Sequence, residues 1–224
     1  MQYPIEFAVE LVCALILAGA FAYGAKRLFR KGKPLYFQLY VLACGCRMLG
    51  HFINAVLLFC DLWDGSFTAT RFFGNLACSL FILSANRGTL DGIVDDRRDK
   101  RNAKARYLAL FAPFLMLALL LAASLSYYEN ISRPASVFLF ISAFPTVPAS
   151  YFNLKHLLLP IDDFELLKAT KGCNICALVL QVLSLVYSIA SVYFSGNAIV
   201  CACEVLVYIP AIFMVAAAVK GVKR

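Results

Sequence analysis

The sequence predicts an all-α, polytopic membrane protein with seven transmembrane helices. Hydrophobic residues make up 62% of the 224 residues and charged residues 15%, and the mean hydropathy is +0.78, far above that of a soluble domain. A hydrocarbon core of roughly 30 Å needs about 20 apolar residues per helix. Seven such helices with short loops use nearly the whole chain, so we expect one transmembrane domain over residues 1–224 and no soluble domain.

Seven apolar stretches are expected to be the membrane-spanning helices. They cover residues 5–23, 35–59, 72–90, 107–124, 135–151, 173–193 and 198–219. The first lacks a basic segment before it and carries Glu6 and Glu10, so we interpret it as a retained helix and not a cleaved signal peptide. The third is the least apolar. The fifth contains Pro145 and Pro148, which are tolerated where neighbouring helices satisfy the freed carbonyls.

Basic residues gather in every second connection. Of the 21 lysines and arginines, almost all fall in the first, third and fifth loops and in the C-terminal tail. The positive-inside rule then places the N-terminus outside and the C-terminus in the cytoplasm of a cell membrane. This topology explains the net charge of +8 without a nucleic-acid partner. The basic loops are expected to meet anionic lipid head groups and to offer a surface to a cytoplasmic protein partner.

Polar side chains are expected to gather in the outer half of the membrane. Arg47, His51 and Asn54 have i, i+4, i+7 spacing and share one helix face. The full predicted cluster comprises Arg47, His51, Asn54, Glu10, Glu204 and Asn75. A charge in hydrocarbon costs about 2.5–3.5 kcal/mol on insertion scales, so these groups should face the bundle interior and find partners. We expect Arg47 to pair with Glu204 or Glu10.

The charges of this cluster do not balance. One arginine meets two carboxylates, so a protonated carboxylate, a protonated His51, a proton or a cationic ligand is needed to complete it. This imbalance favours a proton-sensitive or ligand-filled cavity. The alternative is a structural lock, in which Arg47 and Glu204 join two helices while Glu10 reaches the interface and His51 lies among head groups.

The nine cysteines suggest two further sites. Cys60, Cys201 and Cys203 fall at the outer ends of helices, where a disulfide between Cys60 and one of the others is a candidate. Cys173 and Cys176 form a CxxC pair, for which redox chemistry or acylation is weighed against simple packing. With only two histidines and one CxxC pair, we expect no multi-histidine metal site and no cofactor.

The order of the helices resembles known layouts. Helices one to three and five to seven have the same sense across the membrane, which is similar to the parallel 3+1+3 arrangement of SWEET transporters and KDEL receptors. The proline-glutamine pair that marks those families is missing. The size also resembles a free-standing seven-helix sensory module of bacterial signalling proteins. Helix seven has no lysine before Lys220, which excludes a mid-membrane retinal Schiff base.

Three classes of function remain, because no catalytic or nucleotide-binding motif is present. A ligand-sensing or partner-binding membrane protein is the first interpretation. The alternative is a small-solute transporter, which is favoured if a polar path reaches the cytoplasm through Asn86 and Gln181. The third is a membrane-embedded enzyme using Glu10, Glu204 and His51 as acid and base.

Overall fold

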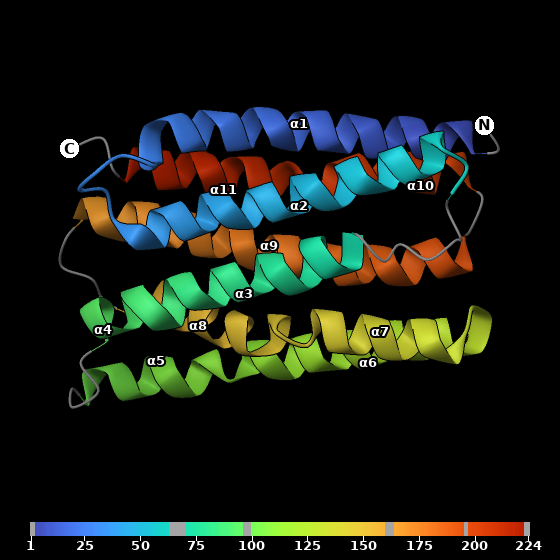
Figure 1. Ribbon diagram of the computed structural model, residues 1–224. Coiled ribbons are helices and arrows are strands. Elements are labelled where there is room, and N and C mark those ends of the chain that lie inside the picture. Colours follow the sequence, from blue (N-terminus) through green and yellow to red (C-terminus); the bar gives the residue numbers. More distant parts are fainter. Residues whose placement is uncertain (1–2, 63–69, 96–99, 160–163, 195–196, 222–224) are drawn as a thin grey trace.

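The computed structural model describes residues 3–62, 70–95, 100–159, 164–194 and 197–221, and these residues form an all-α bundle of long helices lying side by side (Figure 1). Within these ranges, six helices are long and apolar enough to cross a membrane: Pro4–Leu28, Leu35–Phe59, Asn102–Asn130, Arg133–Leu158, Lys168–Tyr193 and Ala198–Lys220. The chain therefore has the helices of an integral membrane protein, and six of the seven predicted spans coincide with helices of this length and composition.

The first two helices follow the prediction closely. Helix α1 (Pro4–Leu28) begins with a proline in its first turn and extends five residues past the predicted end, and Lys26 and Arg27 lie in its last turn. Basic side chains are favourable there because they offset the negative end of the helix dipole. Helix α2 has the predicted bounds, Leu35–Phe59.

The third predicted span is helical but irregular. It consists of η1 (Thr70–Ala77), α3 (Cys78–Leu83), η2 (Ser84–Leu90) and α4 (Asp91–Val94). Two of these four pieces are π-helical, a form that usually occurs as short segments at functional sites. This stretch is not among the six long apolar helices, because polar residues such as Asn75, Asn86 and Arg87 interrupt its apolar run.

Three of the remaining spans are broken near prolines. The helices are α5 (Arg101–Ala109), α6 (Phe111–Asn130), α7 (Arg133–Ala143), α8 (Thr146–Leu158), α9 (Phe164–Tyr193), α10 (Ala198–Val207) and α11 (Ile209–Lys220). Pro113 and Pro210 follow the breaks between α5 and α6 and between α10 and α11, and Pro145 lies within the break between α7 and α8. Proline has no N–H to donate to the carbonyl four residues earlier, so each removes a helical hydrogen bond at the break. The unbroken predicted spans 107–124, 135–151 and 198–219 are corrected accordingly.

Helix α2 lies at the centre of the bundle. In the most apolar 18-residue stretch of α2, 56% of the residues are buried, whereas in that of α1 28% are buried. It packs against α1, α11 and the irregular third span, while α9 packs against α11, α6 and α8. The outer surface is strongly apolar: Phe114 is 70% exposed and Leu15 is 63% exposed. Side chains of this kind on the outside of a bundle are suited to contact with lipid.

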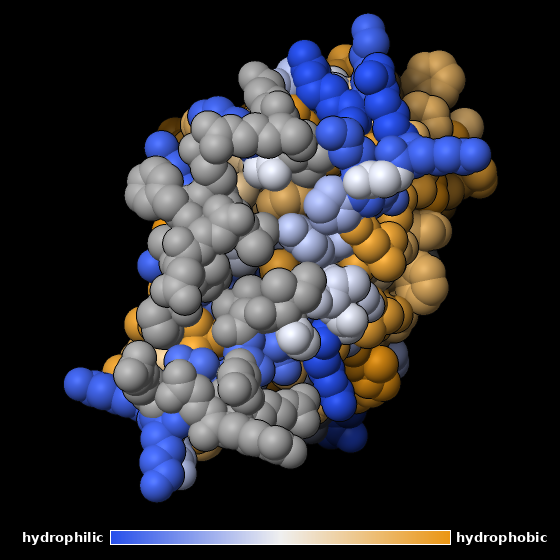
Figure 2. Space-filling model, turned by 90° about the vertical axis from the view of Figure 1, so that its left-hand side faces the viewer, coloured by the Kyte–Doolittle hydropathy of each residue, from blue (hydrophilic) through white to orange (hydrophobic). Residues whose placement is uncertain are grey.

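The bundle has two chemically distinct ends. We call the end at which α1 finishes and α2 begins the basic end, and the end near the N-terminus the far end (Figure 1). Seen end-on, the basic end carries hydrophilic side chains that project at its upper, left and lower edges, and an apolar flank lies on the right (Figure 2). The last span lies between the first two and the sixth, because α11 contacts α1 and α2 as well as α9.

Close packing between α1, α2 and α11 depends on Gly24. A Cβ at this position would lie 2.7 Å from Val215 Cγ1 and 2.8 Å from Val41 Cγ2, whereas a Cβ at Gly19 would meet nothing within 4 Å. We therefore expect Gly24→Val to lower the free energy of unfolding by about 1–3 kcal/mol through overpacking. The measurement is thermal unfolding in detergent, with Gly19→Val as the control for helix propensity. Equal melting temperatures for the two variants would contradict this packing.

Candidate functional site

Buried polar side chains form a stripe along one face of α2. Tyr40, Arg47, His51 and Asn54 are each no more than 1% exposed. Their spacing of seven, four and three residues keeps them on one side of the helix, over a rise of about 21 Å. The stripe therefore carries polar groups along much of the interior of the bundle, and neighbouring helices complete it at two levels.

At the far-end level, side chains from α1, α2 and α10 meet. His51 Nδ1 lies 2.6 Å from Glu10 Oε2, and Asn54 Nδ2 donates to Glu10 Oε1 at 3.1 Å. The ligand atoms of Glu10, His51 and Glu204 all lie within 4.8 Å of one another, and all three residues are buried. The Tyr187 hydroxyl donates to Glu204 Oε2 at 3.2 Å. We call Glu10, His51, Asn54, Tyr187 and Glu204 the far-end cluster.

Arg47 is not paired as expected. No ion pair between described residues joins it to Glu10 or Glu204, and the carboxylate of Glu10 pairs with His51 instead. The Arg47 guanidinium carbon lies 5.6 Å from the centre of the Tyr208 ring, and the same ring packs edge-on against His51 with centroids 4.5 Å apart. Tyr208 stands at the break between α10 and α11, so this discontinuity brings an aromatic ring against both Arg47 and His51.

Two further predictions about this region are corrected or qualified. Asn75 is buried in η1, but within the described ranges no hydrogen bond or ion pair joins it to the far-end cluster. All nine cysteines are free thiols, so the candidate disulfide of Cys60 with Cys201 or Cys203 is not formed. In the CxxC pair, Cys173 is fully buried and its thiol donates to the Met214 carbonyl at 3.6 Å, which is a packing contact between α9 and α11.

A second buried network lies nearer the basic end, where Asn86 of η2 is the central member. Asn86 Nδ2 lies 2.9 Å from both the Tyr40 hydroxyl and Asn153 Oδ1. The Tyr40 hydroxyl donates to Asn174 Oδ1 at 2.8 Å, and Asn153 Nδ2 donates to Gln181 Oε1 at 3.3 Å. These contacts join α2, η2, α8 and α9 through amide and hydroxyl groups.

Charged groups extend this network toward the basic end. His156 Nδ1 lies 2.7 Å from Asn86 Oδ1, and His156 Nε2 lies 3.2 Å from Asp91 Oδ1. Lys155 is paired with Asp91, and its Nζ lies 3.2 Å from Asp95 Oδ2. Asp95 is also paired with Arg106 at 3.2 Å. We call this set of residues the basic-end network: Tyr40, Asn86, Asp91, Asp95, Arg106, Asn153, Lys155, His156, Asn174 and Gln181.

The charge state of Asp91 follows from its partners. Burial raises the pKa of Asp91, but hydrogen bonds from His156 and Lys155 outweigh this effect and lower its pKa to about 2. Asp91 is therefore ionised at neutral pH. His156 contacts an oxygen with each ring nitrogen, so only the doubly protonated ring donates both hydrogen bonds, and the neutral ring donates one.

Between the two levels lie buried polar atoms without a partner among the described residues. They include Ser79 Oγ, Gln181 Nε2, Arg47 Nε and His51 Nε2. Such atoms cost about 1–3 kcal/mol each when they are left unsatisfied, so they are suited to an internal water or a bound polar species. Gln181 lies about two helical turns from both Asn174 and Tyr187 on α9, and Ser79 lies about two turns from Asn86 on the third span.

The sequence predicts four members of the far-end cluster, Glu10, His51, Asn54 and Glu204, but not Tyr187, and it misses much of the basic-end network. Asn86 and Gln181 were singled out as markers of a polar path, and Asn153 is the residue that connects them. Asn153 and His156 fell outside the predicted span 135–151. One feature of the sequence does point to this network: Tyr40 lies seven residues before Arg47, on the same helix face, so the polar stripe continues toward the basic end.

The far-end cluster also has the donor set of a cation site. One imidazole and two carboxylates could hold a small cation or a metal ion, although the chain has no multi-histidine pattern. Comparison with known protein families, curated proteins and solved structures found no match. Function is therefore inferred from these two polar levels alone.

The pairing of Glu10 with His51 can be measured by a double-mutant cycle. We expect Glu10→Gln and His51→Gln to show a coupling free energy of about 1–3 kcal/mol, since the two buried groups contact each other directly. The measurement is equilibrium unfolding in detergent or mixed micelles. Glu6→Gln, one turn away on α1 and partly exposed, is the matched control and should be additive with His51→Gln. Additive effects for the Glu10 cycle would refute the pair.

Proposed function

We propose that this protein is a proton-coupled transporter of a small cation. The carrying observation is that both histidines of the chain are fully buried and each contacts a carboxylate, His51 with Glu10 and His156 with Asp91. The two pairs lie at different levels of one bundle. Each level thus contains an imidazole next to a carboxylate, and histidine is a common proton shuttle in proteins.

The charges of the far-end cluster support a cation as the bound species. With ionised carboxylates on Glu10 and Glu204 and a cationic Arg47 beside them, a neutral His51 leaves one net negative charge in a buried site. A proton on His51 or on a carboxylate removes that charge, and so does a monovalent cation held by the same oxygens. Proton and cation therefore compete for one site, which is the basis of exchange between them.

The basic-end network favours transport over sensing. A sensor requires only the ligand site, whereas a transporter also requires polar groups that lead to the opposite side. Asn86, Asn153 and Gln181 extend the polar interior toward the basic end, and Ser79 and Gln181 present unpartnered polar atoms between the levels. The irregular third span and the break at Tyr208 border the same region, as is common for substrate sites in transporters. Ligand sensing, the first interpretation from sequence, requires none of these features.

Flux through proteoliposomes tests the proposal. Purified protein is reconstituted with a pH-sensitive dye inside, and Na⁺, K⁺ or Mn²⁺ is added outside in separate experiments. We expect one of these cations to drive proton efflux, and we expect Glu204→Gln and Glu10→Gln to reduce the rate at least tenfold because they remove the negative charge. Glu6→Gln should keep the wild-type rate.

The basic-end network supplies the second half of the same test. Asn153→Leu removes the amide that joins Asn86 to Gln181, so it should abolish flux while cation-dependent thermal stabilisation persists. Cation binding without flux in the wild type would instead make the protein a sensor. Neither binding nor flux for any cation would sink the proposal.

The proposed orientation places the basic end in the cytoplasm, as the positive-inside rule requires. Cys60 is an exposed thiol at the far end, where α2 finishes. Cys203 is also exposed and Cys201 is half-buried at this end, so both are first replaced by serine. In that background we expect a membrane-impermeant maleimide to label Cys60 in intact cells, and Cys60→Ser to remove the signal. Lys100→Cys, added to the triple serine variant, should label only after permeabilisation. Labelling of the two sites in the reverse order would invert the topology.

A further inference from the structure

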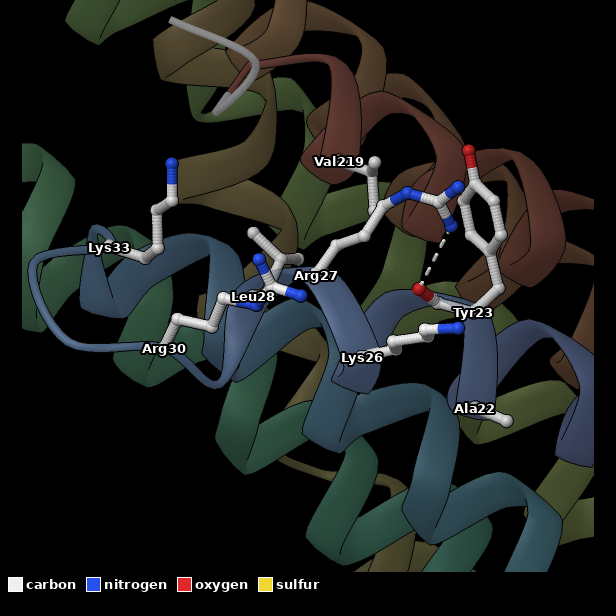
Figure 3. A pocket seen from close by; sticks show the side chains of 8 residues that line it. All are labelled: Ala22, Tyr23, Lys26, Arg27, Leu28, Arg30, Lys33 and Val219. Atoms are coloured by element: carbon white, nitrogen blue, oxygen red, sulfur yellow. Dashed lines mark hydrogen bonds between the residues drawn. The ribbon is translucent and has the colours of Figure 1, made fainter.

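A cavity of about 720 Å³ opens at the basic end, away from both polar levels (Figure 3). Its lining comes from the last two turns of α1, the loop that follows, and Val219 of α11. Four of the eight lining residues are basic: Lys26, Arg27, Arg30 and Lys33. No acidic side chain is among the eight. The cavity thus concentrates positive charge, which neither the cation site nor the transport path explains.

The basic groups are held around the cavity by local structure. The Arg27 guanidinium lies 3.8 Å above the centre of the Tyr23 ring and its Nη1 reaches the Tyr23 carbonyl at 3.5 Å, so it is stacked at the wall (Figure 3). The Lys33 carbonyl accepts a hydrogen bond from Gln38 Nε2 at 3.1 Å, which ties the loop to the first turn of α2. Gly32 has φ +80°, a conformation that glycine adopts without strain, and it turns the loop between Arg30 and Lys33.

We infer that this cavity binds a phosphate-bearing lipid head group. Arginine and lysine are the usual ligands of phosphate oxygens, with arginine giving bidentate contacts and lysine a point charge. Four cations suit a head group with two phosphates, such as that of cardiolipin, better than a single phosphodiester. Basic pockets between transmembrane helices at this level are a known mode of recognition for such lipids.

The lining identifies a lipid as the source of the phosphate. Of the three apolar lining residues, Ala22 is exposed on α1, whereas Leu28 and Val219 are buried beneath the cavity. Phe29 and Leu35, at the adjoining ends of α1 and α2, are 44% and 55% exposed. A head group among the basic side chains would thus have its acyl chains beside exposed apolar surface. A soluble phosphate would use only the basic half.

Lipid titration of the purified full-length protein tests the inference. Cardiolipin added to protein in neutral detergent should raise the melting temperature with a saturable dependence, and phosphatidylcholine should not. In the variant Lys26→Gln/Arg27→Gln/Arg30→Gln the half-saturating cardiolipin concentration should rise about a hundredfold, since each basic side chain contributes roughly fivefold to affinity for an anionic lipid surface. Should that variant fail to fold, Arg30→Gln alone, beyond the end of α1, should weaken binding about fivefold.

A matched control variant distinguishes binding of cardiolipin in this cavity from general electrostatic attraction between the basic protein and anionic lipid. Lys100→Gln/Lys104→Gln/Lys168→Gln removes the same charge from exposed positions that do not line the cavity, and it should leave the half-saturating concentration within twofold of wild type. Equal weakening in both triple variants would overturn the site in favour of diffuse electrostatics. Pyrophosphate that alone reproduces the stabilisation and displaces cardiolipin would overturn the lipid in favour of a soluble phosphate ligand.

Discussion

The constraint on which this structure depends is that a hydrocarbon solvent offers no hydrogen bonds, so each polar group inside the bundle must find its partner within the bundle. Helix α2 shows how this is met. Its stripe from Tyr40 to Asn54 would be prohibitively polar for a lipid-facing helix, so the apolar helices α1 and α11 and the irregular third span enclose it. The polar stripe thereby determines which helix is central, and the flanking helices supply Glu10, Asn86 and Asn174 as partners.

The irregular backbone segments lie where they bring side chains into contact with the polar stripe of α2. The break at Tyr208, two residues before Pro210, brings a ring against both His51 and Arg47, and η2 carries Asn86 to the junction of four helices. A straight helix would continue its own hydrogen bonds at these points and would present a different face. The same discontinuities weaken the local helix, so they are also the places where a small rearrangement costs least. In the proposed transporter these places border the polar path.

The sequence alone predicted the positions of the helices, which depend on transfer of apolar residues into lipid. It did not predict which side chains pair inside the bundle. Hydropathy and length place α2 correctly to the residue, because apolar runs are decided by transfer into lipid. Depth brings Glu10, His51 and Glu204 to one level, because helical rise is constant. Depth cannot say that His51, and not Arg47, takes the Glu10 carboxylate, because that choice depends on helix rotation and packing. Asn153 was missed because Pro145 and Pro148 obscured how far the helix continues beyond Tyr151.

Protonation has opposite effects on the net charge around the two histidines. When the charge of the neighbouring Arg47 is counted, a neutral His51 leaves the far-end cluster with one negative charge in excess. Protonation or cation binding there removes the free-energy cost of that buried charge. At the basic end, Asp91 and Asp95 are already balanced by Lys155 and Arg106, so a proton on His156 adds an excess positive charge even though it completes both ring hydrogen bonds. Proton binding therefore removes net charge at the far end and creates net charge at the basic end. In the proposed exchanger, a cation that enters the far-end cluster would take the place of such a proton, so this cluster is the level at which proton and cation compete.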